Sequence, residues 1–295
     1  MLPATANASE TRFTVGNGYL GTRGTYEEGH RGELSGTYLA GVYDRHDAAV
    51  VDLVNAPDWL AFEVVVGGVR LDLQHCTVLA HERSLDLRQG LLWRRTVFSD
   101  ALGRRTRLES LRLASMADRH VRGLRIAVTT ENHDAGVLIR SSLDGHRRNL
   151  DRLPVYAPDT VVEPEVKWEK WARSRHLVPV GCSADDEAIA LQVQTIDSEI
   201  RLAYAAATEA DRPADHESTE TGYDRVSQRP EYASRAGETQ VVAKIVAGVN
   251  SRAGAAPGRS STPRSGPRAR FRRCARCSGR ARPAGRTSRR SATSW

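Results

Sequence analysis

The sequence predicts an all-β protein, folded as an antiparallel sandwich or barrel, and three observations support this fold class. Apolar residues in residues 12–150 recur with a period of two rather than 3.6, which is typical of half-buried strands. Turn residues separate these short strands at intervals of about 8 to 12 residues. Helical periodicity is scarce, and only Pro164–His176, which opens on a proline suited to a first helical turn, is expected to form a helix.

The clearest element is a hairpin over residues 62–73. Gly67 and Gly68 lie between two alternating runs, and both central positions of a type I′ turn need a positive φ. The turn pairs apolar residues on one face: Val66 with Val69, Val64 with Leu71, and Phe62 with Leu73. On the other face Glu63 lies opposite Asp72, a like-charged pair that we expect to be hydrated or screened by an arginine.

Further strands follow from the same alternation. A second hairpin is expected between residues 92–98 and 104–113, with its turn at 99–103. The remaining expected strands are 120–130, with Leu124, Ile126 and Val128 on one face, then 188–195, 199–206 and 239–249. The polar, turn-rich stretch 208–236 is expected to be a long surface connection.

Charge divides the chain into two parts, residues 1–250 and a tail, residues 251–295. The whole chain of 295 residues carries a net charge of +7, but the tail contains 13 of the 43 lysines and arginines and none of the 36 acidic residues. The tail has too few apolar residues to offset the entropy cost of ordering, so we expect it to be disordered. Its Arg, Ala, Gly, Pro and Ser composition is typical of a GC-rich gene translated out of frame.

Targeting signals and metal-binding spacings are missing from the sequence. Residues 1–10 have neither a basic nor an apolar signal region, and apolar runs such as 64–66 fall far short of the roughly 20 residues that span a bilayer. We therefore expect a cytoplasmic protein with no membrane contact. Cys76 and Cys182 are isolated, and Cys274 and Cys277 form a lone pair without the second pair of a zinc site, so no metal is expected.

No residue pattern points to a catalytic centre. The glycine-rich run 16–24 lacks the lysine of a phosphate-binding loop, so bulges and close backbone approach explain it better. Carboxylates cluster at Glu27-Glu28 and at 185–187, whereas glycosidic chemistry needs two carboxyls about 5–10 Å apart across a sugar. Solvated acidic turns are therefore favoured for both clusters, and no catalytic residue is assigned.

Tryptophans offer the other route to carbohydrate contact. Trp59, Trp168 and Trp171 could stack on sugar rings, and the last two would share one face of the expected helix. Large aromatic side chains more often anchor a core or a seam between domains, and that interpretation is favoured here.

Seven segments resemble the N-terminal domain of glycoside hydrolase family 65, which contains maltose, trehalose and kojibiose phosphorylases and some trehalose hydrolases. They are ETRFTVGNGYLGTRG at 10–24, EE at 27–28, GTYLAGVYD at 36–44, LVNAPDWL at 53–60, LDLRQG at 85–90, SMADRH at 115–120 and SLDGHRRN at 142–149. The resemblance covers about residues 10–250. It implies a large antiparallel β-supersandwich of the galactose mutarotase type with few short helices.

The resemblance also implies where chemistry takes place. In the family the catalytic acid and the phosphate site lie in an (α/α)6 barrel that follows the sandwich, and no segment here matches that barrel. We therefore expect an inactive fragment of an enzyme that acts on an α-glucosidic disaccharide, with inorganic phosphate as co-substrate and no other cofactor. The missing barrel and a second copy of the chain are the expected partners, and Asn17, Tyr19 and Arg23 are candidates for the interdomain interface, with internal packing as the alternative.

Two other functions stay open at this stage. The sandwich could bind carbohydrate without turning it over. The arginine-rich tail could bind nucleic acid, but only Phe271 and Trp295 are available for stacking on bases, so such binding would be unspecific phosphate contact.

Overall fold

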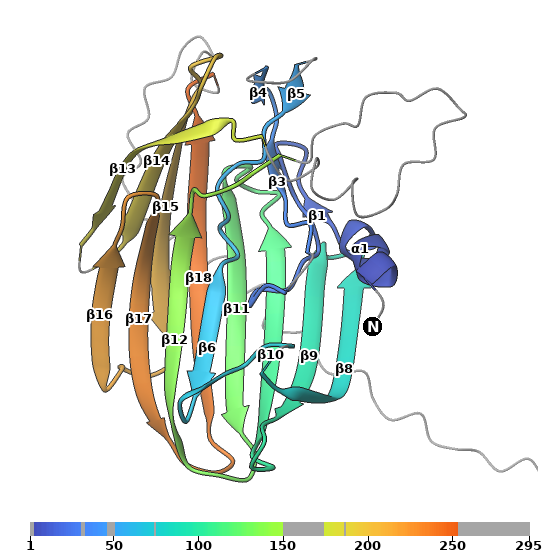
Figure 1. Ribbon diagram of the computed structural model, residues 1–295, viewed down its shortest axis with the longest axis vertical. Helices are drawn as coiled ribbons and strands as arrows, with labels where there is room; N and C mark the ends of the chain where they lie inside the picture. The colour runs from blue at the N-terminus through green and yellow to red at the C-terminus, as the bar shows by residue number, and fades with distance from the viewer. Residues whose placement is uncertain are drawn as a thin grey trace, which may run out of the picture. The chain divides into compact units, whose positions relative to one another are not determined.

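A computed structural model describes residues 3–30, 33–45, 51–73, 75–149, 174–185 and 187–252. Almost all regular structure in these residues is antiparallel strand, which confirms the all-β prediction (Figure 1). The helix that the structure describes, α1 (Pro3–Arg12), was not predicted. Of the predicted helix, 164–173 lies outside the described residues and 174–176 is not helical. No helix in the described ranges is long and apolar enough to cross a bilayer.

An eight-stranded antiparallel sheet is the larger of the two layers. Its strands, in spatial order, are β13 (Leu177–Ala184), β14 (Ile189–Thr195), β15 (Arg201–Ala210), β18 (Thr239–Asn250), β11 (Val121–Thr130), β10 (Arg105–Ala114), β9 (Leu91–Ser99) and β8 (Thr77–Asp86). Leu124, Ile126 and Val128 of β11 are fully buried on one face, as the alternation predicts.

A five-stranded sheet forms the second layer. Its order is β16 (His216–Thr221), β17 (Arg225–Ser234), β12 (Ala135–Asp144), β6 (Phe62–Val66) and β7 (Val69–Arg70). Apolar side chains from both sheets form one core, so the two sheets pack as a sandwich. Figure 1 shows that this smaller sheet covers only part of the large one, and that β8, β9 and β10 extend beyond it.

Short N-terminal strands and loops complete the second layer. They form a three-stranded sheet, β1 (Val15–Gly16), β2 (Leu20–Thr22) and β3 (Thr37–Leu39), and a two-stranded one, β4 (Tyr43–Asp44) and β5 (Asp52–Leu53). Between β2 and β3 the loop 23–30 reaches the strands β9 and β10, where its residues pair with buried arginines.

The Gly67-Gly68 hairpin forms as predicted through most of its length. Both glycines have positive φ values, 56° and 81°, and Val66 pairs with Val69. The predicted pairing of Phe62 with Leu73 is wrong, because the strand ends at Arg70 and Leu73 is 42% exposed. Arg70 lies between Glu63, at 3.8 Å, and Asp72, at 3.0 Å, and so screens the like-charged pair.

The other predicted strands are present as β9, β10, β11, β14, β15 and β18, but the short strands β1 to β5 and five strands of six or more residues do not follow from the prediction. These five longer strands are β8, β12, β13, β16 and β17. The prediction that 208–236 is a surface connection is wrong, because it contains the end of β15 and all of β16 and β17. Polar residues such as Ser227 and Gln228 occupy buried positions there, and hydrogen bonds to neighbouring strands satisfy them. Because polar residues stand where apolar ones are expected, the sequence of these strands lacks a clear apolar alternation.

Candidate functional site

A polar cavity of about 420 Å³ lies where residues 26–30 and Glu33 meet β6 and β12. Its lining comes from segments that are far apart in sequence and includes Glu33, Asp58, Asp144, Arg147 and Arg225. Small-molecule sites in proteins have comparable volumes, and fixed polar groups from several elements converge here, so we take this cavity as a candidate site.

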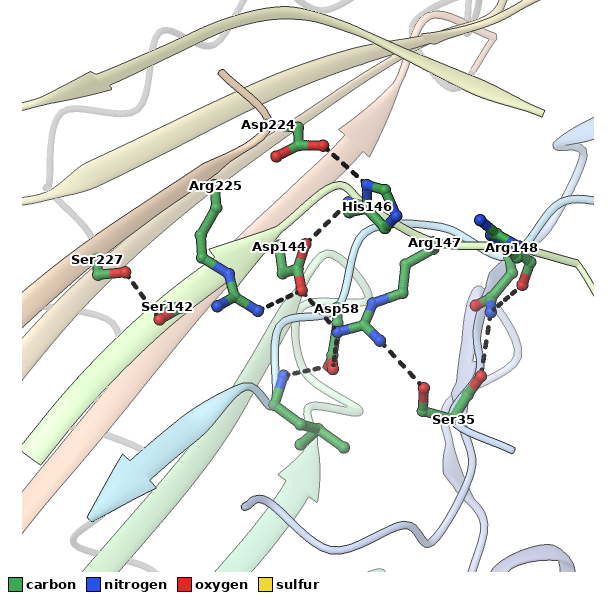
Figure 2. A network of polar contacts seen from close by, with 12 residues as sticks. Ser35, Asp58, Ser142, Asp144, His146, Arg147, Arg148, Asp224, Arg225 and Ser227 are labelled. Atoms are coloured by element: carbon green, nitrogen blue, oxygen red, sulfur yellow. Dashed lines mark hydrogen bonds and ion pairs between the residues drawn. The ribbon is translucent and has the colours of Figure 1, made fainter. Parts of the chain in front are cut away.

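Two arginines and two aspartates form the centre of this site (Figure 2). Arg147 donates from Nη2 to Asp58 Oδ2 at 2.7 Å and to Asp144 Oδ2 at 3.0 Å. Arg225 donates from Nη2 to the same oxygen of Asp144 at 2.6 Å. Such charge-assisted bonds are short and strong, so the four side chains hold one another in fixed orientations.

The end of β12 positions this network. The strand ends at Asp144, whose Oδ1 accepts a hydrogen bond from the amide of His146 at 2.8 Å and so turns the chain. The backbones of Asp58 and Asp144 bond to each other in both directions, at 2.7 and 3.0 Å, which brings the Asp58 loop beside the strand end. His146 lies 3.1 Å from Asp224, and the site is thereby tied to the start of β17.

Glu33 adds a carboxyl of a different kind to the cavity. Its Oε2 accepts a hydrogen bond from the amide of His30 at 3.1 Å. Burial and the nearby charge of Asp58 raise the pKa of Glu33 to about 7. Near neutral pH this side chain can therefore either hold or release a proton.

Glu27 and Glu28 form a second, fully enclosed cluster with Arg94 and Arg112. Arg94 donates to Glu28 at 2.5 and 2.6 Å and to Glu27 at 3.0 Å, and Arg112 donates to the other oxygen of Glu27 at 2.7 Å. Both glutamates are only 5% exposed, so the prediction of a solvated acidic turn is wrong.

The Glu27 carboxylate in this cluster has no proton to give. Burial alone would raise the pKa of Glu27, but the charges of Arg112 and Arg94 outweigh burial and lower that pKa to about 2. A general acid needs a pKa near the operating pH. Glu27 is therefore a structural anion that fastens the loop to β9 and β10.

The acidic cluster at 185–187 makes a local turn. Asp185 is exposed, and its Oδ1 accepts hydrogen bonds from the amides of Glu187 and Ala188 at 2.9 and 2.7 Å. Asp186 lies outside the described residues.

Asn17, the first of the three predicted interface residues, fastens the N-terminal segment to the β10–β11 turn. Its amide nitrogen donates to the carbonyls of Ser115 and Arg119 at 2.7 and 3.1 Å. Its Oδ1 accepts from the amides of Tyr19 and Leu20. These contacts lie within the described sandwich, and the role of Asn17 at an interdomain interface stays a prediction.

Tyr19 and Arg23 also make contacts within the sandwich. The Tyr19 hydroxyl accepts a hydrogen bond from Asn250 at 3.1 Å, and the side chain is 8% exposed. Arg23 forms an ion pair with Glu10 of α1 at 3.5 Å. Their predicted interface role is likewise untested.

Of the three tryptophans considered for sugar stacking, Trp59 lies within the described residues, and it is a core residue. Trp59 is 1% exposed, and its Nε1 donates to Thr22 Oγ1 at 3.0 Å. It therefore has no free ring face for a sugar. Trp168 and Trp171 lie outside the described residues.

Metal ligands do not converge in the described part of the chain. No group of three or more His, Cys, Asp or Glu side chains there has an arrangement suited to a metal ion. Cys76 and Cys182 are free thiols. The Cys274 and Cys277 pair lies outside the described residues, so the predicted lack of a metal site stays a prediction.

The cavity residues Glu33, Asp58, Asp144, Arg147 and Arg225 were not singled out as site residues from sequence. Asp58, Asp144 and Arg147 lie within two of the segments that carry the family resemblance, but neighbouring charges of both signs in a sequence do not indicate which side chains form ion pairs. The usable signal was a charged run, DGHRRN, directly after an alternating segment at 135–143.

Comparison with known proteins agrees with this fold. The sequence profile of the glycosyl hydrolase family 65 N-terminal domain matches residues 1–275. A kojibiose phosphorylase of Thermoanaerobacter brockii is 36% identical over 199 residues, which are 67% of this chain and 24% of that protein. A nigerose phosphorylase of Lachnoclostridium phytofermentans is 36% identical over 134 residues, which are 45% of this chain and 18% of that protein.

A solved structure has the same architecture. A chain described as a kojibiose phosphorylase from the human microbiome superimposes with a TM-score of 0.70 at 20% identity, over 87% of this chain and 32% of that one. The chain thus spans about a quarter or less of the curated relatives that it matches. The match over residues 1–275 shows that this chain belongs to glycosyl hydrolase family 65, through the N-terminal domain of that family.

Proposed function

We propose that this chain is the N-terminal β-sandwich domain of a disaccharide phosphorylase, or a related glycoside hydrolase, that acts on α-glucosides. The observation that carries the proposal is the family match over residues 1–275. Relatives named as kojibiose, nigerose and α,α-trehalose phosphorylases support it, because all three names describe phosphorolysis of a disaccharide. The proposed substrate class is an α-glucosidic disaccharide, with inorganic phosphate as co-substrate.

We propose in addition that the sandwich is not itself the catalyst. Phosphorolysis needs a carboxylic acid that protonates the glycosidic oxygen while phosphate attacks the opposite face of the sugar. Glu27 is ionised and enclosed by arginines, so it cannot serve as this acid. Glu33 has a suitable pKa, but each arginine of its cavity is already bound to a carboxylate, so no unpaired cation is there to hold phosphate.

We propose that the catalytic groups come from an (α/α)6 barrel. We also propose that the protein assembles into a homo-oligomer. Asn17 supports a docking role for its end of the sandwich, since it holds the 115–120 turn that presents Met116, which is 83% exposed. Tyr19 and Arg23 lie in the same N-terminal segment and are proposed to support this surface.

An activity assay tests the proposal. The purified chain is incubated with maltose, trehalose, kojibiose or nigerose, with and without phosphate, and release of glucose 1-phosphate or glucose is followed. We expect no sustained turnover. Turnover that is lost in Glu33→Gln, while the variant keeps its circular dichroism spectrum, would overturn the proposal and make Glu33 the acid.

A further inference from the structure

We propose that the polar cavity beside residues 26–30 and Glu33 binds an uncharged polyhydroxy ligand, a mono- or disaccharide, in the sandwich itself. The proposal goes beyond the phosphorylase assignment and does not depend on it, because it concerns binding by residues of this chain alone. The volume of about 420 Å³ falls within the range of small-molecule sites. Residues from the N-terminal loop, β6, β12 and β17 converge on this cavity, which requires the whole sandwich to be folded.

The charge of the cavity argues against an anionic ligand. Seven residues of the lining carry a side-chain carboxyl group, and four are arginines. Two of the seven carboxylates, Glu27 and Glu28, are already paired with Arg94 and Arg112, which leaves five carboxyl groups against the four arginines. With Glu33 protonated these charges balance, so an anion such as phosphate finds no unpaired cation in this lining.

Each arginine of the cavity is already paired, which leaves directed hydrogen-bonding groups rather than free charges. Arg147 and Arg225 are bound to Asp144, Arg140 lies 2.5 Å from Glu63, and Arg70 lies 3.0 Å from Asp72. A guanidinium has five donors and a carboxylate about four acceptor positions, so pairing does not exhaust either group. A ligand that both donates and accepts without carrying charge fits this lining, and hydroxyl groups do so.

Glu33 is the group best placed to respond to such a ligand. The hydrogen bond from the His30 amide engages Oε2, and no described arginine or lysine lies within ion-pair distance of the carboxyl. Protonated or ionised, this carboxyl can bond a hydroxyl group. It is therefore the specificity contact that can be changed without breaking an ion pair among the described residues.

Ala61 offers a way to close the cavity without touching its charges. It lines the cavity next to Phe62 at the start of β6. A phenylalanine at this position would occupy part of the ligand volume. Ala61→Phe and Glu33→Gln thus test occupancy and recognition separately.

The experiment is an NMR titration of the full 295-residue chain with glucose, maltose and kojibiose, with inorganic phosphate and putrescine as the anionic and cationic probes. We expect saturable shifts with a saccharide, confined to signals from the cavity residues, and none with phosphate or putrescine. Binding of phosphate or putrescine in place of a saccharide, or no saturable binding of any saccharide, would overturn the proposal.

The variants make the test specific. We expect Ala61→Phe to weaken binding at least about tenfold and Glu33→Gln about three- to tenfold, as for the loss of one ordinary hydrogen bond. Glu82→Gln, an exposed residue of β8, is the matched control and should bind like the parent chain. Circular dichroism checks each fold; if Ala61→Phe fails to fold, Glu33→Gln decides the question. Unchanged affinity in a folded Ala61→Phe, or in Glu33→Gln, would overturn the assignment of the site.

Discussion

Two regions of the large sheet, strand β11 and the neighbouring strands β9 and β10, bury different kinds of side chain on the same face. Strand β11, covered by the smaller sheet, buries Leu124, Ile126 and Val128. Strands β9 and β10, where the loop 23–30 packs, bury Arg94 and Arg112 on the same face of the sheet. The strand alternation is the same in both halves, and both contribute to the apolar core, but Leu124, Ile126 and Val128 are surrounded by hydrocarbon whereas Arg94 and Arg112 are buried in an ionic cluster.

The difference lies in what covers each half. A strand within a sheet presents side chains at every second position and bonds its backbone groups to the neighbouring strands, so it can cover an apolar surface. A loop brings carbonyl groups that need donors, and Arg112 provides them by bonding to the carbonyls of Arg23 and Thr25. The glutamates of the loop then balance the arginines, because an unpaired buried charge is strongly destabilising.

The largest effect should come from unpairing the ionic half. Arg112→Met removes both carbonyl contacts and leaves Glu27 buried with only Arg94 as its cation. We expect a loss of about 3–5 kcal/mol in the free energy of unfolding in urea at pH 7. Arg125→Met, an exposed site on β11, is the control and should change stability by less than about 0.5 kcal/mol. A loss below about 1 kcal/mol in Arg112→Met would show that the cluster does not hold the loop.

A smaller effect, with a different pH response, is expected in the apolar half. Leu124→Ala leaves a cavity between the sheets and should cost about 3 kcal/mol. This loss should be equal at pH 7 and pH 3, because no titrating group is removed. The cost of Arg112→Met should instead shrink at pH 3, where Glu27 without its arginine takes up a proton. Equal pH responses of the two variants would erase the distinction between the halves.

The smallest effect concerns a cation placed in the apolar half. Lys244 of β18 is fully buried and donates to the carbonyl of Ser142, and burial lowers its pKa to about 7. A folded pKa below the unfolded one means that the unfolded chain binds more protons between about pH 7 and 10.5, so stability rises with pH in that window. Lys244→Met should therefore stabilise the protein by about 1 kcal/mol at pH 7.

That gain should shrink as the pH rises from 7 towards 10.5, because keeping the buried lysine of the parent chain neutral then costs less and less free energy. Thermal melts of both proteins at pH 7 and pH 10 measure it. Destabilisation by Lys244→Met at both pH values would mean that the bond to Ser142 outweighs the cost of burying the charge.

The apolar half was readable from sequence and the ionic half was not. Gly67-Gly68 and the alternation around Leu124 depend on local geometry, so they predicted the hairpin and β11. Burial of Glu27 depends on arginines that lie 67 and 85 positions away, and no local pattern reports such a contact. For the same reason the sequence predicts a surface connection where β17 lies, since the buried Gln228 is satisfied by a hydrogen bond from Thr208 of another strand.

The candidate site combines both cases. Asp144 could have been placed at a strand end, because an Asp-Gly pair follows an alternating run. Its partners Asp58 and Arg225 come from 86 positions before it and 81 after it, and only the folded sandwich brings them together. Their roles therefore required the structure.

Glu27 stabilises the fold of this domain as a buried carboxylate and takes no part in proton transfer. Its pKa, measured by carbon-13 NMR of the side-chain carboxyl with Glu27→Gln to assign the signal, tests this role. We predict a pKa of about 2, so that the stability from this group is complete above the ordinary value of 4.5 and is lost as the pH falls towards 2. A measured pKa at or above 4.5 would contradict it, and one near 6 or 7 would restore Glu27 as a candidate general acid.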